Sequence, residues 1–321
     1  MIISQLVLMG CQTPISQINK SSHDDLTRKE HILQMDTFWR IDVVDEKRMD
    51  LSGLVIVNDE RFLTIDDKQF NLYELRLQKG SSRAYIVASD LIRIEDLKEL
   101  RETKTGQLDC EGLAVDADGN IYICEEKHRW ILKINSNGKF LNRLKIDWSP
   151  VEQYFNALDK NASFEGIAVS KNNLYVINER DKALIIVVDL NSLKVIDHFK
   201  VYSKMHPSLF VHYSGLSWFD GKLYILLRHS QVILEIDPES HNVIAEYSFR
   251  NTARQSEFNY RSRFGTGCME GLHVSDDFFW MLTDNNGCAL KNNKDEKHPT
   301  LIRFKRPEHS NPIATLSGHK D

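Results

Sequence analysis

A repeated unit constrains the fold of this chain more than any other feature of its sequence. Five copies each begin with a short apolar segment around a glycine, and these glycines are Gly53, Gly112, Gly166, Gly215 and Gly271. Each copy continues through a polar turn into a second apolar run, and third and fourth runs follow in most copies. Turn residues between short apolar runs indicate hairpins. The sequence therefore predicts five four-stranded antiparallel units.

Units of this kind can close into a ring, as in a β-propeller, which leaves few open strand edges. A solenoid would expose its terminal sheets, and an immunoglobulin-like sandwich needs only about seven strands. A chain of 321 residues fits one such domain. We expect an all-β propeller over residues 35–321 with five blades, or six if one blade is too degenerate to recognise.

The last unit departs from the pattern, and the N-terminal part of the chain offers a strand to complete it. Residues 287–297 form an insertion in this unit, and only residues 313–316 remain for its fourth strand. The run from Thr37 to Val43 precedes the first unit and has the character of a fourth strand. We expect it to close the ring. Residues 94–103 and 150–160 are expected to be crossing loops with short helices.

The first strand of each blade lines the channel, so residues at its start should gather at one mouth. Glu111, Glu165 and Glu270 hold this position in three units, with Ser52 and Ser214 in the other two. Converging carboxylates raise one another's pKa unless a cation lies among them. Ca²⁺ accepts a flexible shell of about 6 to 8 oxygens. We predict a calcium site formed by the three glutamates; the alternative is that each caps backbone N–H groups or pairs with a local Arg or Lys.

A second ring is expected where the second strands end. Its members are Asp67, Glu126, Glu179, Arg228 and Asp284. We assign Asp67, Glu126 and Arg228 to the channel rim. Both rings together would form an acidic funnel, which favours a cation or a substrate held through one. The alternative is a solvated row of polar hairpin ends.

Catalytic motifs give little guidance. The sequence contains no G-x-S-x-G elbow, no H-E-x-x-H and no P-loop. His273 and His212 are the histidines expected nearest the axis, although core or surface positions are the alternative for both. If the protein is a metal-dependent hydrolase, Glu179, Asp284 and His273 are the candidates for activating water.

The N-terminal residues resemble a bacterial lipoprotein signal. Leu8 to Cys11 has the character of a lipobox, which would place cleavage before Cys11, a lipid on that cysteine and a polar tether over residues 12–34. The protein would then lie on the periplasmic side of the cell envelope. The apolar run is too short to span a bilayer and lacks preceding basic residues, so the alternative is a frayed N-terminus of a cytosolic protein.

Cysteines and charge narrow the remaining choices. Cys110, Cys124, Cys268 and Cys288 could form disulfides in an oxidising compartment or remain buried thiols. The formal net charge is -5, and Lys and Arg are scattered along the chain. Because nucleic-acid binding needs a basic patch, we expect no nucleic-acid partner. Membrane contact is expected only through the N-terminal lipid.

Three segments carry a family resemblance: DCEGLAVDADGNIYICEE, NASFEGIAVSKNNLYVINERDKALIIVVDL and YSGLSWFDGKLYILLRHSQVILEID. They resemble the bacterial propellers called SdiA-regulated proteins, which are similar to NHL-repeat propellers, and more loosely the esterase-like phytase-like domain family. The resemblance implies a five-bladed propeller, often exported, with a calcium site at the channel. On this sequence that site maps to Glu111, Glu165 and Glu270. The phytase-like resemblance implies hydrolysis of esters or phosphate esters.

Two functions of different class follow. The first, which we prefer at this point, is a calcium-bound envelope propeller that binds a small molecule or an envelope protein. The second is a calcium-dependent hydrolase of small esters, lactones or phosphate esters. Fold likeness alone does not transfer an activity. A base beside the metal, with an open coordination position, would favour the hydrolase.

Overall fold

A computed structural model describes residues 28–43, 48–58, 60–67, 71–89, 91, 108–138, 140–159, 162–180, 182–262 and 268–307. All described strands except β1 group into five antiparallel units of four. In chain order from the inner edge outward, the first unit is β3 (Leu51–Val57), β4 (Arg61–Asp66), β5 (Asn71–Leu77) and β6 (Arg83–Ala88). The second is β7 (Cys110–Val115), β8 (Ile121–Glu125), β9 (Trp130–Ile134) and β10 (Phe140–Leu144). The third is β11 (Phe164–Val169), β12 (Asn173–Asn178), β13 (Leu184–Asp189) and β14 (Lys194–Phe199). The fourth is β15 (Tyr213–Phe219), β16 (Lys222–Leu227), β17 (Val232–Ile236) and β18 (Val243–Ser248). The last is β19 (Met269–Val274), β20 (Phe278–Thr283), β21 (Thr300–Lys305) and β2 (Met35–Asp42).

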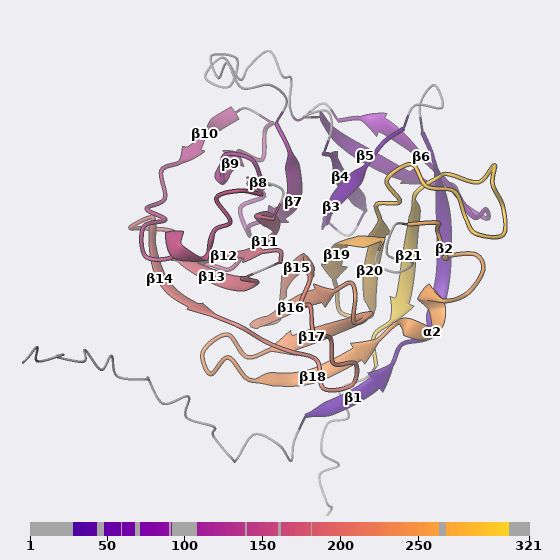
Figure 1. The fold of residues 1–321 in the computed structure, drawn as a ribbon. Helices are drawn as coiled ribbons and strands as arrows, with labels where there is room; N and C mark the ends of the chain where they lie inside the picture. Colours follow the sequence, from indigo (N-terminus) through magenta and orange to yellow (C-terminus); the bar gives the residue numbers. More distant parts are fainter. Residues whose placement is uncertain are drawn as a thin grey trace, which may run out of the picture.

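The five innermost strands form a closed cycle. Each contacts the next in the order β3, β7, β11, β15, β19 and back to β3, and Figure 1 looks down on this ring. Every residue position in the repeat therefore recurs around one central axis. The prediction of an all-β propeller with four-stranded antiparallel blades is confirmed.

The ring is closed by the N-terminal part of the chain, as the sequence predicts. Strand β2 pairs antiparallel with β21, with Trp39 opposite Leu301. It also pairs parallel with β6 of the first unit, with Arg40 opposite Arg83, which joins the first and last units into one eight-stranded sheet. The alternative fourth strand at residues 313–316 lies outside the described residues.

Two expected boundaries are refined by the structure. Residues 29–32, which the sequence assigns to a tether, form strand β1 (Lys29–Ile32) and pair in parallel with the outer strand β18. The crossing loop at residues 150–160 contains a short 3-10 helix (Glu152–Tyr154). The loop at residues 94–103 and Cys11 lie outside the described residues. A one-turn helix α2 (Arg250–Ala253) follows β18. No helix in the described part of the chain is long and apolar enough to cross a membrane.

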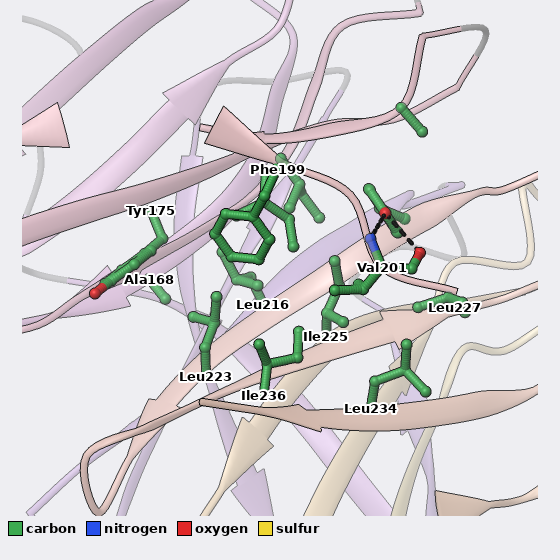
Figure 2. Packing of buried hydrophobic residues seen from close by; sticks show 14 of the residues in the cluster. Ala168, Tyr175, Phe199, Val201, Leu216, Leu223, Ile225, Leu227, Leu234 and Ile236 are labelled. Carbon is green, nitrogen blue, oxygen red and sulfur yellow. Dashed lines mark hydrogen bonds between the residues drawn. The ribbon is translucent and has the colours of Figure 1, made fainter. Parts of the chain in front are cut away.

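The hydrophobic core lies between the faces of neighbouring blades. Figure 2 shows the cluster between the third and fourth units, where Tyr175 and Phe199 pack with Leu216, Ile225 and Leu234. The repeated glycines permit the inner strands to approach. A Cβ atom at Gly112 would lie 2.9 Å from the Cα of Gly166, whereas real Cβ contacts are longer. The repeat therefore keeps glycine here for packing at the axis.

The four described cysteines are free thiols. Cys110 and Cys124 are fully buried in the second unit, whereas Cys268 and Cys288 are partly exposed. The sequence left disulfides and thiols open, and in this structure the four cysteines are thiols.

Candidate functional site

The glutamates of the first strands are set by an irregularity in the sheet. The pairing of β7 with β8 shifts between Cys110 and Gly112, so Glu111 has no direct partner across the pair. The same shift occurs in β11 between Phe164 and Gly166 and in β19 between Met269 and Gly271. A bulge of this kind bends the strand and redirects the extra side chain. This explains why the glutamates turn toward the axis although their neighbours pack in the sheet.

These three glutamates line one narrow axial cavity. Glu111, Glu165 and Glu270 contribute to its wall together with Ser214 and the repeated glycines. Its volume is about 10 Å³, which is room for roughly one water-sized sphere. The structure thus gathers the predicted residues at the axis. Each of the three glutamates nevertheless contacts a different set of charged residues.

Glu111 lies in a first cluster of carboxylates, which we call the first triad. Carboxylate oxygens of Asp67, Asp109 and Glu111 all lie within 4.8 Å of one another. Burial raises the pKa of Glu111 well above its ordinary value, the charges of Asp67, Glu126 and Asp109 add to the rise, and a hydrogen bond with Ser52 opposes it. Lys127 Nζ lies 3.5 Å from Asp109 Oδ2. Burial and mutual repulsion therefore disfavour full ionisation of the first triad.

Glu165 lies in a second cluster, the second triad, with Glu126 and Glu179. Oxygens of these three residues also lie within 4.8 Å of one another. Burial raises the pKa of Glu126 to about 8, although the backbone N–H of Ser163 donates to its Oε1 at 3.1 Å. The pKa of Glu165 is likewise raised well above its ordinary value by burial and then by the charge of Glu179. Protons and cations therefore compete for this cluster near neutral pH.

Arginine side chains neutralise part of the second triad. Arg228 Nη2 donates to Glu179 Oε1 at 2.5 Å, and Arg180 also pairs with Glu179. Arg228 Nη1 pairs with Glu270 Oε1, so one guanidinium links the third and last blades. Burial still raises the pKa of Glu179, with both arginines lowering it. Glu270 is 7% exposed, and its Oε2 has no hydrogen-bond partner among the described residues.

The rim residues follow the second strands, as predicted. Asp67, Glu126 and Arg228 come directly after β4, β8 and β16. The same backbone hydrogen bond recurs in three units and links the rim to a third ring of residues. The N–H groups of Asp67, Glu126 and Glu179 donate to the carbonyl oxygens of the residues three positions before the repeat glycines. The members of this third ring are Asp50, Asp109, Ser163, His212 and Cys268. Sequence reasoning missed this ring, although aligning the repeats at their glycines would have found it.

The triads fit a hard divalent cation. Their donors are carboxylate oxygens, which Ca²⁺ prefers. They are mostly buried, and repulsion among them raises pKa values that a cation would lower. The unpartnered buried oxygen of Glu270 offers a further acceptor at the axial cavity. The first triad fits better than the second, because two guanidinium groups contact the second.

A much larger cavity of about 1060 Å³ opens beside the acidic mouth. Its polar wall includes Arg180, Arg228, His212, His229 and Asp284. The two histidine rings stack with their centroids 4.1 Å apart. Burial lowers the pKa of His212 to about 3 and also lowers that of His229, with the charge of Arg228 adding to both. Burial therefore favours the neutral form of both rings.

Asp284 is the acidic side chain in this cavity wall. It is 6% exposed, and the N–H of Asn286 donates to its Oδ1 at 2.8 Å. Burial raises its pKa to about 7, with the charges of Asp50 and Asp67 adding to the rise. A carboxylate with a pKa near the working pH suits general-base catalysis.

The other two catalytic candidates are placed differently. Glu179 is engaged by Arg228 and Arg180, so it is less suited to accept a proton. His273 accepts a hydrogen bond from the backbone N–H of Ile56 at 3.4 Å and lines neither of the two cavities. Burial lowers its pKa to about 4.

Comparison with known proteins adds a family match over part of the chain and a fold. Residues 49–197 match the family described as "Phytase-like: Esterase-like activity of phytase". The chain is a β-propeller with a phytase-like segment. The predicted resemblance to phytase-like and SdiA-regulated propellers fits both findings. No curated protein matches the sequence.

Solved structures resemble this propeller in fold. The glutaminyl cyclase of Myxococcus xanthus has a TM-score of 0.57 and 13% identity, covering 87% of this chain and 98% of that one. A protein of unknown function from Bacteroides caccae has a TM-score of 0.47 and 12% identity, covering 80% and 78%. Virginiamycin B lyase from Staphylococcus aureus has a TM-score of 0.41 and 14% identity, covering 86% and 75%. The last two are too distant to bear on the fold, and none at such identity transfers an activity.

Proposed function

We propose that this propeller is a calcium-dependent hydrolase of esters that acts where the acidic mouth meets the large cavity. The observation that carries the proposal is that Arg180 and Arg228, which pair with Glu179 of the second triad, line a cavity of about 1060 Å³, because an ion with a purely structural role needs no such space. All six triad residues fall within the phytase-like segment at residues 49–197, whose family description names esterase-like activity.

Each group of the site has an assigned role in this proposal. The first triad is the main candidate for holding the cation, with the second triad next to it. When bound, the cation supplies Lewis-acid polarisation of the ester and lowers the pKa of a coordinated water. Asp284 accepts a proton from the attacking water, since its pKa is about 7 and it lines the cavity. Arg228 presents positive charge to the same cavity, where negative charge develops in the transition state.

Separate variants test the metal and the base. Calorimetry with calcium should show weaker binding to Asp109→Asn and Glu111→Gln than to the wild type. A panel of carboxylic and phosphate esters should show that Asp284→Asn loses about 10² to 10⁴ in kcat while calcium affinity is retained. Glu239→Gln, at an exposed position, is the matched control and should change neither. Calcium binding to the wild type without hydrolysis of any ester would contradict the proposal.

A binding propeller remains the second candidate, and one observation favours it. Arg228 and Arg180 already neutralise Glu179 and one oxygen of Glu270 without any cation. A single ion at the first triad could then serve only to stabilise the mouth, while the cavity binds a ligand or partner. A calcium-soaked crystal distinguishes the two, because an ion closed off by protein oxygens favours binding and coordinated waters facing the cavity favour hydrolysis.

The location of the protein is a separate proposal. We propose that a lipid on Cys11 anchors it to the cell envelope, with the propeller on the periplasmic side; the support is the lipobox-like run from Leu8. Labelling with radioactive palmitate should mark the wild type but not Cys11→Ala. Equal labelling of both, or of neither, would contradict the anchor.

A further inference from the structure

One wall of the large cavity is apolar and exposed. Leu209 is 97% exposed, Phe210 is 74% exposed and Tyr202 is 55% exposed, and all three line the cavity. The described part of the chain has few other large apolar residues as exposed as these. Contiguous exposed apolar residues that rim a cavity commonly mark a binding site.

The segment that presents these residues is firmly held at its base. It joins β14 to β15, and the hydroxyl of Tyr213 makes 2.9 Å hydrogen bonds with both the N–H and the carbonyl of Val201. Figure 2 shows Val201 packed against the core that contains Phe199 and Leu216. The segment that carries the apolar rim, formed by Tyr202, Leu209 and Phe210, is therefore tied to the core at its base.

A buried carboxylate fixes the next part of the same segment. Glu246 is 0% exposed and accepts hydrogen bonds from Ser203 Oγ at 2.6 Å, from the N–H of Lys204 at 2.8 Å and from the N–H of Met205 at 3.1 Å. Because the segment is anchored just before Leu209, its apolar side chains are held in contact with water. Such exposure costs free energy unless a ligand covers them.

The rest of the cavity wall offers a small number of polar groups. Asn285 is 1% exposed, and its Oδ1 has no hydrogen-bond partner among the described residues, although its Nδ2 donates to the carbonyls of Cys288 and Lys297. A buried acceptor in a cavity wall requires a donor from a ligand or water. Lys200 lines the same cavity and forms no ion pair with another described residue.

The other arginines among the described residues of the cavity wall are already engaged. Arg228 pairs with Glu179 and Glu270, and Arg180 pairs with Glu179 and Asp159. A ligand with several phosphate groups would need several available cations, and it would approach the carboxylates of the mouth. The charge of the described residues that line this cavity therefore favours a ligand with one anionic or polar group over a polyanion.

We propose that the cavity takes a carboxylic ester with a medium-length apolar acyl chain and one small polar head group. The chain lies against Leu209 and Phe210, and the head meets Asn285 and Lys200. This inference rests on the proposed hydrolase function and names its substrate class. In the reaction, the hydroxyl of water bonds to the acyl carbon, the ester C–O bond breaks, and the proton of water passes to the leaving alcohol.

Binding tests the pocket independently of catalysis. Calorimetry with decanoate, acetate and inositol hexakisphosphate as probes compares the wild type with the double variant Leu209→Ser/Phe210→Ser. Exposed substitutions seldom unfold a protein. We expect decanoate to bind best to the wild type and about tenfold or more weakly to the double variant, given the apolar area lost. Ile196→Ser, at a position 56% exposed outside the cavity wall, is the control and should bind decanoate like the wild type.

Hydrolysis then tests the substrate class. For p-nitrophenyl acetate, butyrate and octanoate, kcat/KM should rise with chain length in the wild type and stay flat in the double variant. Decanoate binding that is lost in the double variant, with no ester hydrolysed, supports the pocket while removing the hydrolase function. Tighter binding of inositol hexakisphosphate than of decanoate, or decanoate binding unchanged in the double variant, overturns the inference.

Discussion

The buried carboxylates of the mouth should make the metal-free protein less stable as the pH rises, and Glu126 gives the clearest case. Its pKa lies at about 8 in the folded protein against 4.5 for an ordinary glutamate, because the side chain is buried. The native state therefore holds this proton more tightly than the unfolded state. The stability contributed by the proton is complete below about pH 4 and is lost as the pH rises through about 8.

The structure sets the size of the effect. Each pKa unit corresponds to about 1.4 kcal/mol, so a shift from 4.5 to about 8 amounts to about 5 kcal/mol at most over this pH range. Glu126→Gln removes the ionisation but keeps the oxygen that accepts the N–H of Ser163. In EDTA we expect the variant to match the wild type near pH 5 and to exceed its unfolding free energy by several kcal/mol near pH 8.5.

Calcium should reverse the sign of this difference. With excess calcium near pH 8.5, the wild type gains stability from the bound ion, whereas the variant lacks one carboxylate of the second triad and gains less. Urea unfolding with and without calcium at both pH values measures all four cases. Glu239→Gln, which is exposed, should show no dependence on pH or calcium beyond that of the wild type. If Glu126→Gln is less stable than the wild type near pH 8.5 in EDTA, the carboxylate is favourably bound as an anion and the reasoning fails.

Three further substitutions test other parts of the molecule. Arg228→Met leaves Glu179 and Glu270 without their shared guanidinium, so urea unfolding at neutral pH should show an unfolding free energy lower by about 3 to 5 kcal/mol. This loss should shrink near pH 5 as the carboxylates take up protons, and an equal loss at both pH values would contradict the electrostatic cause. Gly112→Ala places a Cβ atom 2.9 Å from the neighbouring inner strand and should cost about 1 to 3 kcal/mol in the same assay, whereas a change below about 0.5 kcal/mol would show that the inner strands can separate. Tyr213→Phe removes both hydrogen bonds to Val201, so we expect the unfolding free energy to fall by about 1 to 3 kcal/mol and amide exchange over residues 200–212 to become faster. Unchanged exchange would show that this contact does not anchor the segment.

The repeat made the fold predictable. A glycine with a recurring set of apolar runs and turns specifies one blade, and closure follows because an open end would expose a strand edge. The N-terminal strand β2 was predictable for the same reason, since the last unit lacked a clear fourth strand and the run from Thr37 to Val43 lacked a partner. Strand β1 was not, because residues 29–32 read as part of a polar tether and their partner β18 is far away in the sequence.

The site was predictable only in part. Aligning the repeats brought Glu111, Glu165 and Glu270 to the axis, where the structure also has them. Their division into different clusters depends on bulges and on the spacing between neighbouring blades, which a sequence pattern does not contain. The third ring was missed because its chemistry changes from Asp109 to Ser163 around the axis, so no single residue type marks it. The large cavity was missed because its walls combine hairpin ends of the blades with segments between the repeats, such as the one that carries Leu209 and Phe210.

The departures from the repeat explain where the site lies. In a symmetrical ring, five equal acids would converge on the axis and their repulsion would be greatest there. Here the first three blades supply both triads, whereas the fourth supplies Arg228, which removes part of the charge on the side of the last blade. The neutralised side is the one on which the large cavity opens, with its apolar rim and neutral histidines. A cation and an apolar ligand can then lie side by side at one mouth, because divergence among the blades has separated charge from apolar surface.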